Sequence, residues 1–236
     1  MAERAGEADE AERLLEEQQR YYRERAAEYD DWFFRRGRYD LGADFNEQWT
    51  ADVATVRRAL AQLAPYGEAL ELACGTGNWT SQLAAGATSV TAVDGAAEMI
   101  EISRAKSAAT NVTHEVADLF AWRGAGRYDT IFFGFWLSHV PPERFVEFWQ
   151  NVGRALAPGG RAFFVDSLAY DATGEGRSRE GVVERRRLND GRQFSIVKVI
   201  YEPERLGREL ADLGWRCEIT TSGRFFIYGS RLRATA

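Results

Sequence analysis

The 236-residue chain is poor in cysteine and histidine and has no long apolar run. Its two cysteines, Cys74 and Cys217, are far apart and lack CxxC spacing, so the sequence predicts neither a metal site nor a disulfide framework. No stretch approaches the roughly 20 apolar residues that a membrane span needs. The charged start of the chain is unlike a signal peptide, so we expect a cytoplasmic protein that does not act on membranes.

Clustered positive charge is also lacking. The net charge of −6 argues against a nucleic-acid partner, because binding to nucleic acids depends on cations gathered to neutralise phosphates. Hydrophobic residues make up 45% of the chain, which is normal for a globular core, and the length suits one α/β domain. We therefore expect a small-molecule partner, while the oligomeric state stays open.

The first part of the chain has two helical patterns. Apolar residues among many charges predict an amphipathic helix over about 9–29, and the spacing from Trp49 to Leu63 predicts a second helix. The segment 30–48 between them resembles a loop. The domain boundaries that we expect are a charged extension at 1–20, one domain at 21–236, a helical lid region at 21–66 and a hairpin cap at 168–201.

From Ala69 the pattern changes to short apolar runs that alternate with helical segments, as in a mostly parallel sheet. The predicted strands are 69–74, 89–94, 112–117, 129–135 and 161–167. A helix is expected to begin at Pro141, and the residues from Ala157 to Gly160 are expected to end it and to start the fifth strand.

Two hairpins are predicted in the last third of the chain. Alternating runs flank Asn189, Asp190 and Gly191, after a glycine- and charge-rich insertion, and this indicates an inserted β-hairpin. A helix at 203–213 then precedes two strands at 215–221 and 224–230. Such a closing antiparallel hairpin is not expected in the parallel sheet of a dehydrogenase.

The turn after the first predicted strand carries the strongest chemical signal. Glycines at Gly75 and Gly77 let the backbone approach a ligand, and Asp94, at the end of the second strand, can accept hydrogen bonds from both hydroxyls of a ribose. Asp118 follows the third strand, where its carboxylate can accept a hydrogen bond from the amino group of an adenine or simply cap a helix. Thr80 stands where the NAD fingerprint needs a third glycine, so an NAD-dependent oxidoreductase is the weaker alternative.

The motifs ELACGTGNWT, VTAVDGAAEMI, VADLFAW, DTIFFGFWLSHV and LAPGGRAFFVDS resemble, in this order, those of class I S-adenosylmethionine (SAM)-dependent methyltransferases. The resemblance implies a Rossmann-like α/β fold whose seven-stranded sheet has an antiparallel last strand. It implies that SAM is the cofactor and S-adenosylhomocysteine (SAH) the product. The residues placed at the cofactor by these motifs are Glu71, Ala73, Gly75, Gly77, Trp79, Asp94, Gly95, Met99, Asp118, Leu119, Phe133 and Gly134.

The segments YYRERAAEYD, FWLSHVPPERFVEFW and LNDGRQFSIVKVI are similar to those of phosphonate O-methyltransferases from phosphonate-antibiotic biosynthesis. In that family a hairpin after the fifth strand supplies cations to the acceptor, and Arg186 and Lys198 match those positions. The segment 31–46 departs from the family pattern, and its Arg36 and Tyr39 are further candidates for the acceptor pocket.

Three residues of the first helix, Tyr22, Arg25 and Tyr29, are expected to close over SAM as a lid. Trp136 is a candidate for the wall of the acceptor pocket. His139 is the candidate catalytic base, or else a residue that orients a loop. An anionic acceptor, such as a phosphonate or carboxylate, would need no base, whereas a hydroxyl or amine would. A non-catalytic SAM-binding module is a further alternative.

Overall fold

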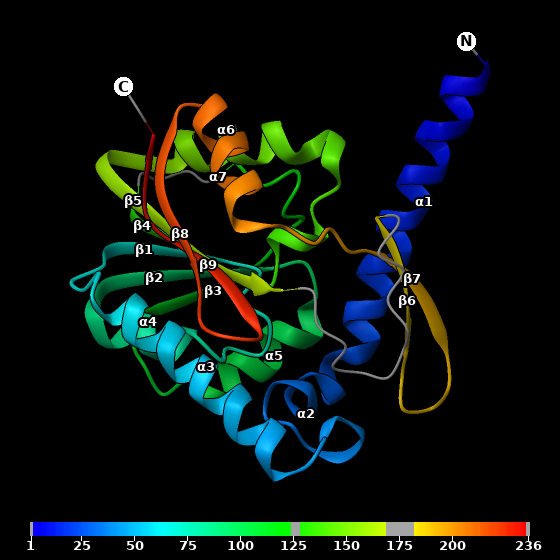
Figure 1. The fold of residues 1–236 in the computed structure, drawn as a ribbon, viewed down its shortest axis with the longest axis horizontal. Helices are drawn as coiled ribbons and strands as arrows, with labels where there is room; N and C mark the ends of the chain where they lie inside the picture. Colours follow the sequence, from blue (N-terminus) through cyan, green and yellow to red (C-terminus); the bar gives the residue numbers. More distant parts are fainter. Residues whose placement is uncertain (1, 124–127, 169–181, 235–236) are drawn as a thin grey trace.

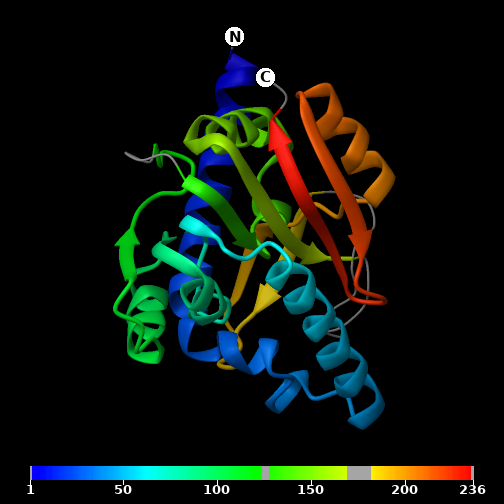
Figure 2. The ribbon, with the colours of Figure 1, turned by 90° about the vertical axis from the view of Figure 1, so that its left-hand side faces the viewer.

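The computed structural model describes residues 2–123, 128–168 and 182–234. Its centre is a seven-stranded sheet with the strand order β3-β2-β1-β4-β5-β9-β8 (Figure 1). Strands β1 to β5 run parallel, and β9 runs antiparallel to both β5 and β8. Figure 2 shows β3 and β8 at opposite edges of the sheet. The predicted α/β sheet with an antiparallel last strand is confirmed.

The strands of the sheet are β1 (Gly67–Leu72), β2 (Ala87–Asp94), β3 (Val112–Val116), β4 (Tyr128–Gly134), β5 (Leu156–Ser167), β8 (Trp215–Thr221) and β9 (Phe226–Ala234), and the separate hairpin is formed by β6 (Val183–Arg187) and β7 (Gln193–Val197). The α-helices are α1 (Ala2–Arg25), α2 (Tyr29–Phe33), α3 (Ala43–Ala61), α4 (Thr80–Gly86), α5 (Ala97–Lys106), α6 (Phe145–Ala155) and α7 (Pro203–Asp212). Short 3₁₀ turns lie at Ala26–Glu28, Gly37–Tyr39, Leu137–His139 and Pro142–Arg144.

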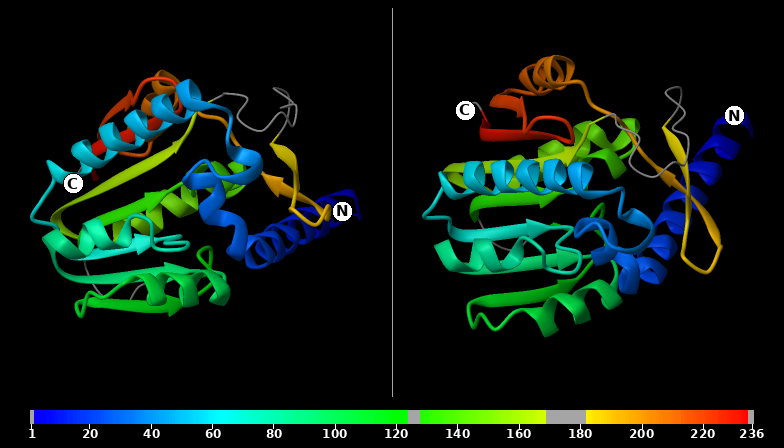
Figure 3. Two further views of the ribbon diagram at one scale, coloured as in Figure 1. Left: turned by 90° about the horizontal axis from the view of Figure 1, so that it is seen from below. Right: turned by 60° about the horizontal axis from the view of Figure 1, so that its bottom comes forward.

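Helices cover both faces of the sheet. On one face α3 and α4 bury residues such as Trp49 and Leu83 in the same cluster as Phe132 and Phe163. On the other face α6 and α7 pack their apolar residues with Phe133 and neighbouring side chains. The right panel of Figure 3 shows α3, α4 and α5 in front of the sheet and α6 behind it. The two cores hold the carboxyl ends of the parallel strands in place.

Some boundaries differ from those predicted. The first helix starts at Ala2, well before residue 9, because its alanines, glutamates and arginines are strong helix formers. The segment 30–48, predicted as a loop, contains most of α2, a 3₁₀ turn and the start of α3. The Ala157–Gly160 region does not separate α6 from β5, because β5 already begins at Leu156 and a register irregularity accommodates these residues.

The start of the helix after β4 also differs from the prediction. A 3₁₀ turn over Pro142–Arg144 precedes α6, so the regular helix starts after Pro141 rather than at it. The glycine- and charge-rich insertion at 171–181 lies outside the described residues. Within the part of the chain that the structure describes, no helix combines the length and apolar character needed to cross a membrane.

Helix α1 and the hairpin β6–β7 lie side by side at one end of the domain, beyond the carboxyl ends of the parallel strands (Figure 1). Tyr21 of α1 packs with Leu188, Phe194 and Ile196 of the hairpin in a small apolar cluster of their own. The predicted hairpin is confirmed; the Leu188 amide bonds the Arg192 carbonyl at 2.9 Å, and Arg186 lies opposite Phe194. We call α1, the residues from Ala26 to Phe33 that follow it, and this hairpin the cap.

Candidate active site

A pocket lies where the carboxyl ends of β1, β2 and β4 meet the cap. Ligands of open α/β sheets bind in this position. The lining residues are Gln18, Gln19, Tyr22, Tyr29, Ala73, Gly75, Asp94, Gly95, Ala96, Met99, Asp118, Leu119, Phe120, Gly134, Phe135, Trp136 and His139. Twelve of these were named from the sequence, whereas Gln18, Gln19, Ala96, Phe120 and Phe135 were not.

The turn that follows β1 exposes backbone to the pocket. Ala73 has a φ of 55° and Gly75 a φ of 54°, a left-handed conformation that is unusual for alanine and free of strain for glycine. Gly77 serves a different purpose, since a Cβ there would lie 2.6 Å from the Ser103 hydroxyl of α5. Gly77 therefore allows the turn to pack on α5, and it does not line the pocket.

Asp94 is the buried acid of the pocket. Its carboxylate accepts hydrogen bonds from the backbone N–H groups of Gly75 at 2.8 Å and Ala96 at 2.9 Å. Burial raises the pKa of Asp94 to about 6, although these hydrogen bonds oppose the shift. A carboxylate has about four lone-pair directions, so two remain for a ligand's hydroxyl groups. The two remaining lone-pair directions of Asp94 fit the two hydroxyl groups of a ribose.

Three of the residues predicted at the cofactor lie behind the pocket wall. Glu71 is 1% exposed and accepts a hydrogen bond from the Thr80 hydroxyl at 2.6 Å, and burial raises its pKa to about 8. Trp79 stacks with Arg57 and packs on Phe132. Phe133 is buried against α6. None of the three lines the pocket, so they would support the site rather than touch a ligand.

The end of the pocket near β3 is mostly apolar. Met99, Leu119 and Phe120 line it, and Met99 also packs against Ala26 of the cap. Asp118 lies there too, and its carboxylate accepts a hydrogen bond from the Phe120 backbone at 2.9 Å. Asp118 thus fixes the local turn while it faces the pocket, and the apolar walls suit a flat ring.

The cap closes the pocket with Tyr22 and Tyr29, of which Tyr29 lies close to Gly75. Arg25 is buried behind them, with its guanidinium over the rings of Tyr21, Tyr29, Trp32 and Tyr39 at 5.3–5.9 Å. Within the described part of the chain, no carboxylate pairs with Arg25, and its Nε has no hydrogen-bond partner. The cap thus places an uncompensated positive charge beside the pocket.

His139 lies beside Tyr22 in the pocket wall and is 5% exposed. Its Nδ1 is 2.6 Å from the Val197 carbonyl, which can only accept, so Nδ1 carries the proton and Nε2 accepts from the Tyr22 hydroxyl at 2.7 Å. Burial, followed by the charges of Lys198, Arg186 and Arg25, lowers the pKa of His139 well below its usual value. The imidazole is therefore neutral, and its basic nitrogen is already engaged.

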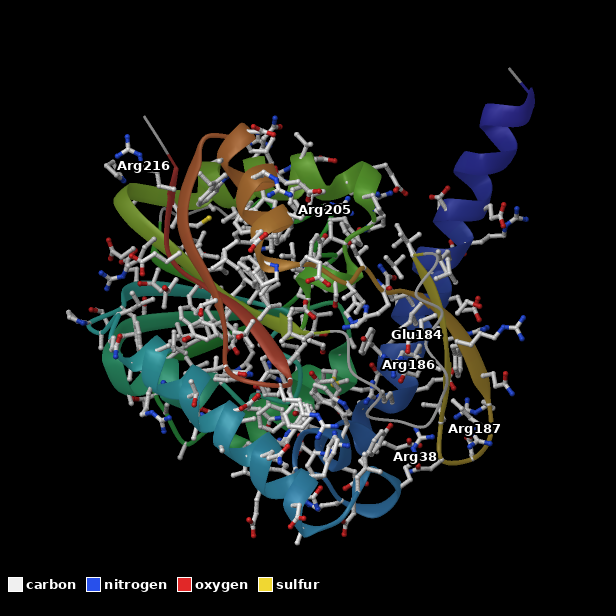
Figure 4. The ribbon with its side chains drawn as sticks, in the orientation of Figure 1. Arg38, Glu184, Arg186, Arg187, Arg205 and Arg216 are labelled. Carbon is white, nitrogen blue, oxygen red and sulfur yellow. The ribbon has the colours of Figure 1, made fainter. Side chains whose placement is uncertain are left out.

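The two predicted cations of the hairpin region lie near His139 and have acidic partners. Lys198 is buried and donates to the Ser138 hydroxyl at 2.7 Å and to Asp166 at 3.3 Å. Arg186 pairs with Glu184 at 3.1 Å, and its Nε has no partner. Figure 4 shows Glu184 and Arg186 on the side of the hairpin that faces the domain, with Arg187 and Arg38 nearer its turn.

The remaining candidates for the acceptor divide into two groups. Trp136 lines the pocket, packs against Phe120 at 5.2 Å and leaves its indole N–H without a partner. Arg36 is exposed and stacks on Phe34, and Tyr39 is buried and accepts a hydrogen bond from Arg38. Arg36 and Tyr39 do not line the pocket.

The fold and the pocket together define a class I SAM-dependent methyltransferase. The model of a methyltransferase domain family matches residues 69–160, the stretch that carries the glycine turn and Asp94. A comparison with curated protein sequences gives no match. The methyltransferase prediction is confirmed, and it is preferred over the dehydrogenase alternative.

Among solved structures, the chain is similar to DhpI. The DhpI complex with SAH is 37% identical, with a TM-score of 0.78 over 94% of this chain and 97% of DhpI. The DhpI complex with SAM and HEP is 38% identical, with a TM-score of 0.77 over 93% and 97% of the two chains. The chain therefore belongs to the class I SAM-dependent methyltransferases related to DhpI, and SAM is its cofactor.

A more distant likeness concerns the fold alone. The glycopeptide N-methyltransferase MtfA, solved with SAM, is 18% identical, with a TM-score of 0.57 over 76% of this chain and 86% of MtfA. This likeness shows that the overall fold is shared.

Proposed function

We propose that the protein transfers the methyl group of SAM to an oxygen atom of a small anionic acceptor, and that this acceptor is a phosphonate. The resemblance of LNDGRQFSIVKVI and neighbouring segments to phosphonate O-methyltransferases supports this assignment. The DhpI complex with SAM and HEP supports a small-molecule acceptor. The observation that carries the proposal is the group of cations around a neutral His139.

In this proposal the chain holds SAM along the carboxyl edge of the sheet. Asp94 would accept from the ribose hydroxyls, while Met99, Leu119 and Asp118 would surround the adenine. The turn from Ala73 to Gly77 would lie along the methionine part, under a lid formed by residues 21–66. SAM supplies a methyl group on a sulfonium, which is a good leaving group, so the protein has to align the acceptor and exclude water.

The acceptor would lie between His139 and the hairpin β6–β7. Arg186 pairs with Glu184 and Lys198 with Asp166, whereas Arg25 has no carboxylate partner in the described part of the chain, so the site retains positive charge. Guanidinium groups bind phosphonate-like oxygens well, because their planar fork can donate two hydrogen bonds. Positive charge of this kind would orient an anionic oxygen toward the methyl group.

His139 is poorly suited to act as a base in this arrangement. Its burial and the surrounding cations disfavour the imidazolium that proton abstraction would create. The lone pair on its unprotonated Nε2 already accepts a hydrogen bond from the Tyr22 hydroxyl. An anionic acceptor has no proton to lose, so the arrangement fits a phosphonate better than a hydroxyl or an amine. His139 then orients Tyr22.

A test compares acceptors that share one carbon skeleton and end in a phosphonate, a carboxylate, a phenol or an amine. The purified protein would be incubated with each acceptor and with SAM that carries a labelled methyl group. We expect label in a phosphonate monomethyl ester, identified by phosphorus NMR and mass spectrometry. Methylation of the phenol or amine, with the phosphonate unreacted, would contradict the proposal.

A further inference from the structure

Gln18 of α1 is a buried amide that joins three elements of the site. It is 3% exposed, and its Oε1 accepts a hydrogen bond from the backbone N–H of Val197, at the end of β7, at 2.9 Å. Its Nε2 donates to the backbone carbonyl of His139 at 3.3 Å. Gln18 also lines the pocket. A single side chain of the cap thus bonds both the hairpin and the turn that carries His139.

The bonds around Gln18 close a ring. The Val197 N–H is bound by Gln18, and the Val197 carbonyl accepts from the ring of His139 at 2.6 Å. The His139 carbonyl then accepts from Gln18. Lys198 follows Val197 directly in the chain, and Tyr22 lies four residues after Gln18, on the same side of α1. The ring therefore fixes Tyr22, His139 and Lys198 relative to one another.

Other side chains of α1 and of the turn after it bond the hairpin in the same way. Glu17 accepts from the Ser195 N–H at 2.8 Å, and Glu28 accepts from the Asn189 N–H at 2.9 Å. The backbone N–H groups on the outer edge of β7 therefore bond side chains of α1 rather than another strand. Buried or half-buried backbone groups need such partners. Together with the packing of Tyr21 on Phe194, these bonds make α1 and the hairpin one unit.

We infer that Gln18 is a positioning residue that couples SAM binding to acceptor binding. The side of α1 that carries Tyr22 closes over the SAM pocket. Because Gln18 bonds both the His139 carbonyl and the end of β7 before Lys198, the position of α1 fixes the positions of these two segments. A docked α1 therefore sets the acceptor cations in place. The inference rests on the proposed function for the identity of the acceptor, but the coupling is a property of the cap itself.

The experiment compares Gln18→Ala and Gln18→Glu with wild type, and uses Glu16→Ala, an exposed position on the same helix, as the control. The acceptor probe is HEP, the small molecule present with SAM in the DhpI complex, and the cofactor probe is SAH. Calorimetry gives the affinity for HEP with and without SAH, and steady-state kinetics give KM and kcat. In wild type we expect SAH to tighten HEP binding by about fivefold or more, the usual lower range of coupling between sites.

Gln18→Ala should abolish most of this tightening and raise the KM for HEP, with a smaller change in the affinity for SAH. Gln18→Glu keeps an acceptor for the Val197 N–H but loses the donor to His139, so it should give an intermediate result. Glu16→Ala should match wild type. Equal losses of SAH and HEP affinity would show that Gln18 acts by touching the cofactor, and an unchanged coupling would overturn the inference.

Hydrogen exchange of the full-length protein separates this inference from the proposed function. The Val197 amide should become better protected when SAH binds to wild type, and this gain should be lost in Gln18→Ala. The Ser195 amide, which bonds Glu17, should keep its protection in both and thereby show that the cap is folded. If no phosphonate is methylated, the proposed function fails. If the protection of the Val197 amide changes neither with SAH nor with the substitution, the coupling is overturned.

Discussion

The two sides of the pocket are built in different ways. The cofactor side is assembled from the ends of neighbouring strands, with Ala73, Gly75 and Asp94 all near one turn. On the acceptor side, Gln18 and Tyr22 bond His139, and Gln18 also bonds Val197. These hydrogen bonds join residues that are 117 to 179 positions apart in the chain. Local spacing can therefore encode the cofactor side, whereas only the folded cap creates the acceptor side.

The electrostatics of the two sides also differ. Asp94 contributes a carboxylate whose pKa is raised to about 6 by burial, so it is ionised at neutral pH. His139 is kept neutral by burial and by neighbouring cations. One side thus suits neutral hydroxyl donors, and the other suits an anion. A substitution at Asp94 or at a cation of the acceptor side should therefore change the affinity for the ligand of its own side more than the affinity for the other ligand.

The largest expected effect comes from the cofactor side. Asp94→Ala removes an acceptor for the ribose and leaves the Gly75 and Ala96 N–H groups without their bond. We expect SAM binding to weaken by about 1.5–3 kcal/mol, or roughly 10- to 150-fold, the range for hydrogen bonds to charged groups. Calorimetry on the folded variant measures this. Unchanged SAM affinity would remove Asp94 from the cofactor site.

Arg186→Ala tests the acceptor side in the same manner. We expect the KM for the phosphonate to rise by roughly tenfold, the scale of one charge-assisted hydrogen bond, while SAM affinity stays nearly constant. Arg186 is the cleaner choice, because removing Lys198 would leave the buried Asp166 without its cation and destabilise the fold. His139→Ala should have a smaller effect on turnover. The reverse order of effects would indicate a protonated acceptor.

SAM binding should also depend on pH through Asp94. Only the ionised carboxylate accepts from both ribose hydroxyls, so SAM affinity should be constant above the pKa of about 6 and fall as the pH drops through it. The slope should approach one tenfold loss per pH unit, as expected for one proton. Titrations with SAH between pH 5 and 8 measure the slope. Asp94→Asn should bind more weakly and without this slope.

Asp30 of α2 offers a smaller test of how the cap meets the cofactor side. Its carboxylate accepts from the Thr76 hydroxyl at 2.6 Å and from Asn78 at 3.1 Å, and it pairs with Lys106. Burial alone would raise the pKa of Asp30, but the bonds to Lys106 and Thr76 outweigh it and lower the pKa. Asp30→Asn should weaken SAM binding by a factor of about 2 to 10.

Asp31→Asn is the matched control for this prediction. Asp31 is the next residue of α2, is of the same type and is also partly buried. We expect its replacement to leave SAM affinity within about a factor of two, as for most surface changes. Equal effects of the two substitutions would mean that Asp30 acts through the helix rather than through the turn.

Glu71→Gln should have the smallest effect. The pKa of Glu71 is raised to about 8 by burial, so the side chain is mostly neutral at pH 7 and glutamine imitates it. The Thr80 hydroxyl keeps its acceptor in this variant. SAM affinity should change by less than about a factor of two, in contrast to Asp94→Ala. A large loss would mean that Glu71 touches the cofactor after all.

The sequence predicted one side of the site better than the other for a physical reason. Gly75 and Asp94 could be found because glycine turns and strand-end acids recur at fixed spacing, and the pocket residues Tyr22, Met99 and His139 followed from the motifs. Gln18 could not be found, because a glutamine on an amphipathic helix has no signal before its partner strand is placed. The charges around His139 likewise depend on the tertiary structure.

The residues that lie elsewhere also have identifiable reasons. Phe133 was placed at the cofactor from its position in a motif, but side chains alternate along β4, and Phe133 points to the α6 face while Gly134 reaches the pocket. Arg36 was named as an acceptor candidate without any periodicity to show which side chains of its segment are buried. In the structure Arg35 is buried over Trp49, and Arg36 is exposed.

The central claim, that the acceptor reacts as an anion without a base, can be tested by the pH dependence of kcat/KM for HEP. Wild type and His139→Gln would be compared, with SAM saturating at each pH, so that Asp94 does not contribute. We predict profiles of the same shape, which rise with the ionisation of the acceptor and then level off. A wild-type profile with an added ionisation that disappears in His139→Gln, along with most of kcat, would contradict the account.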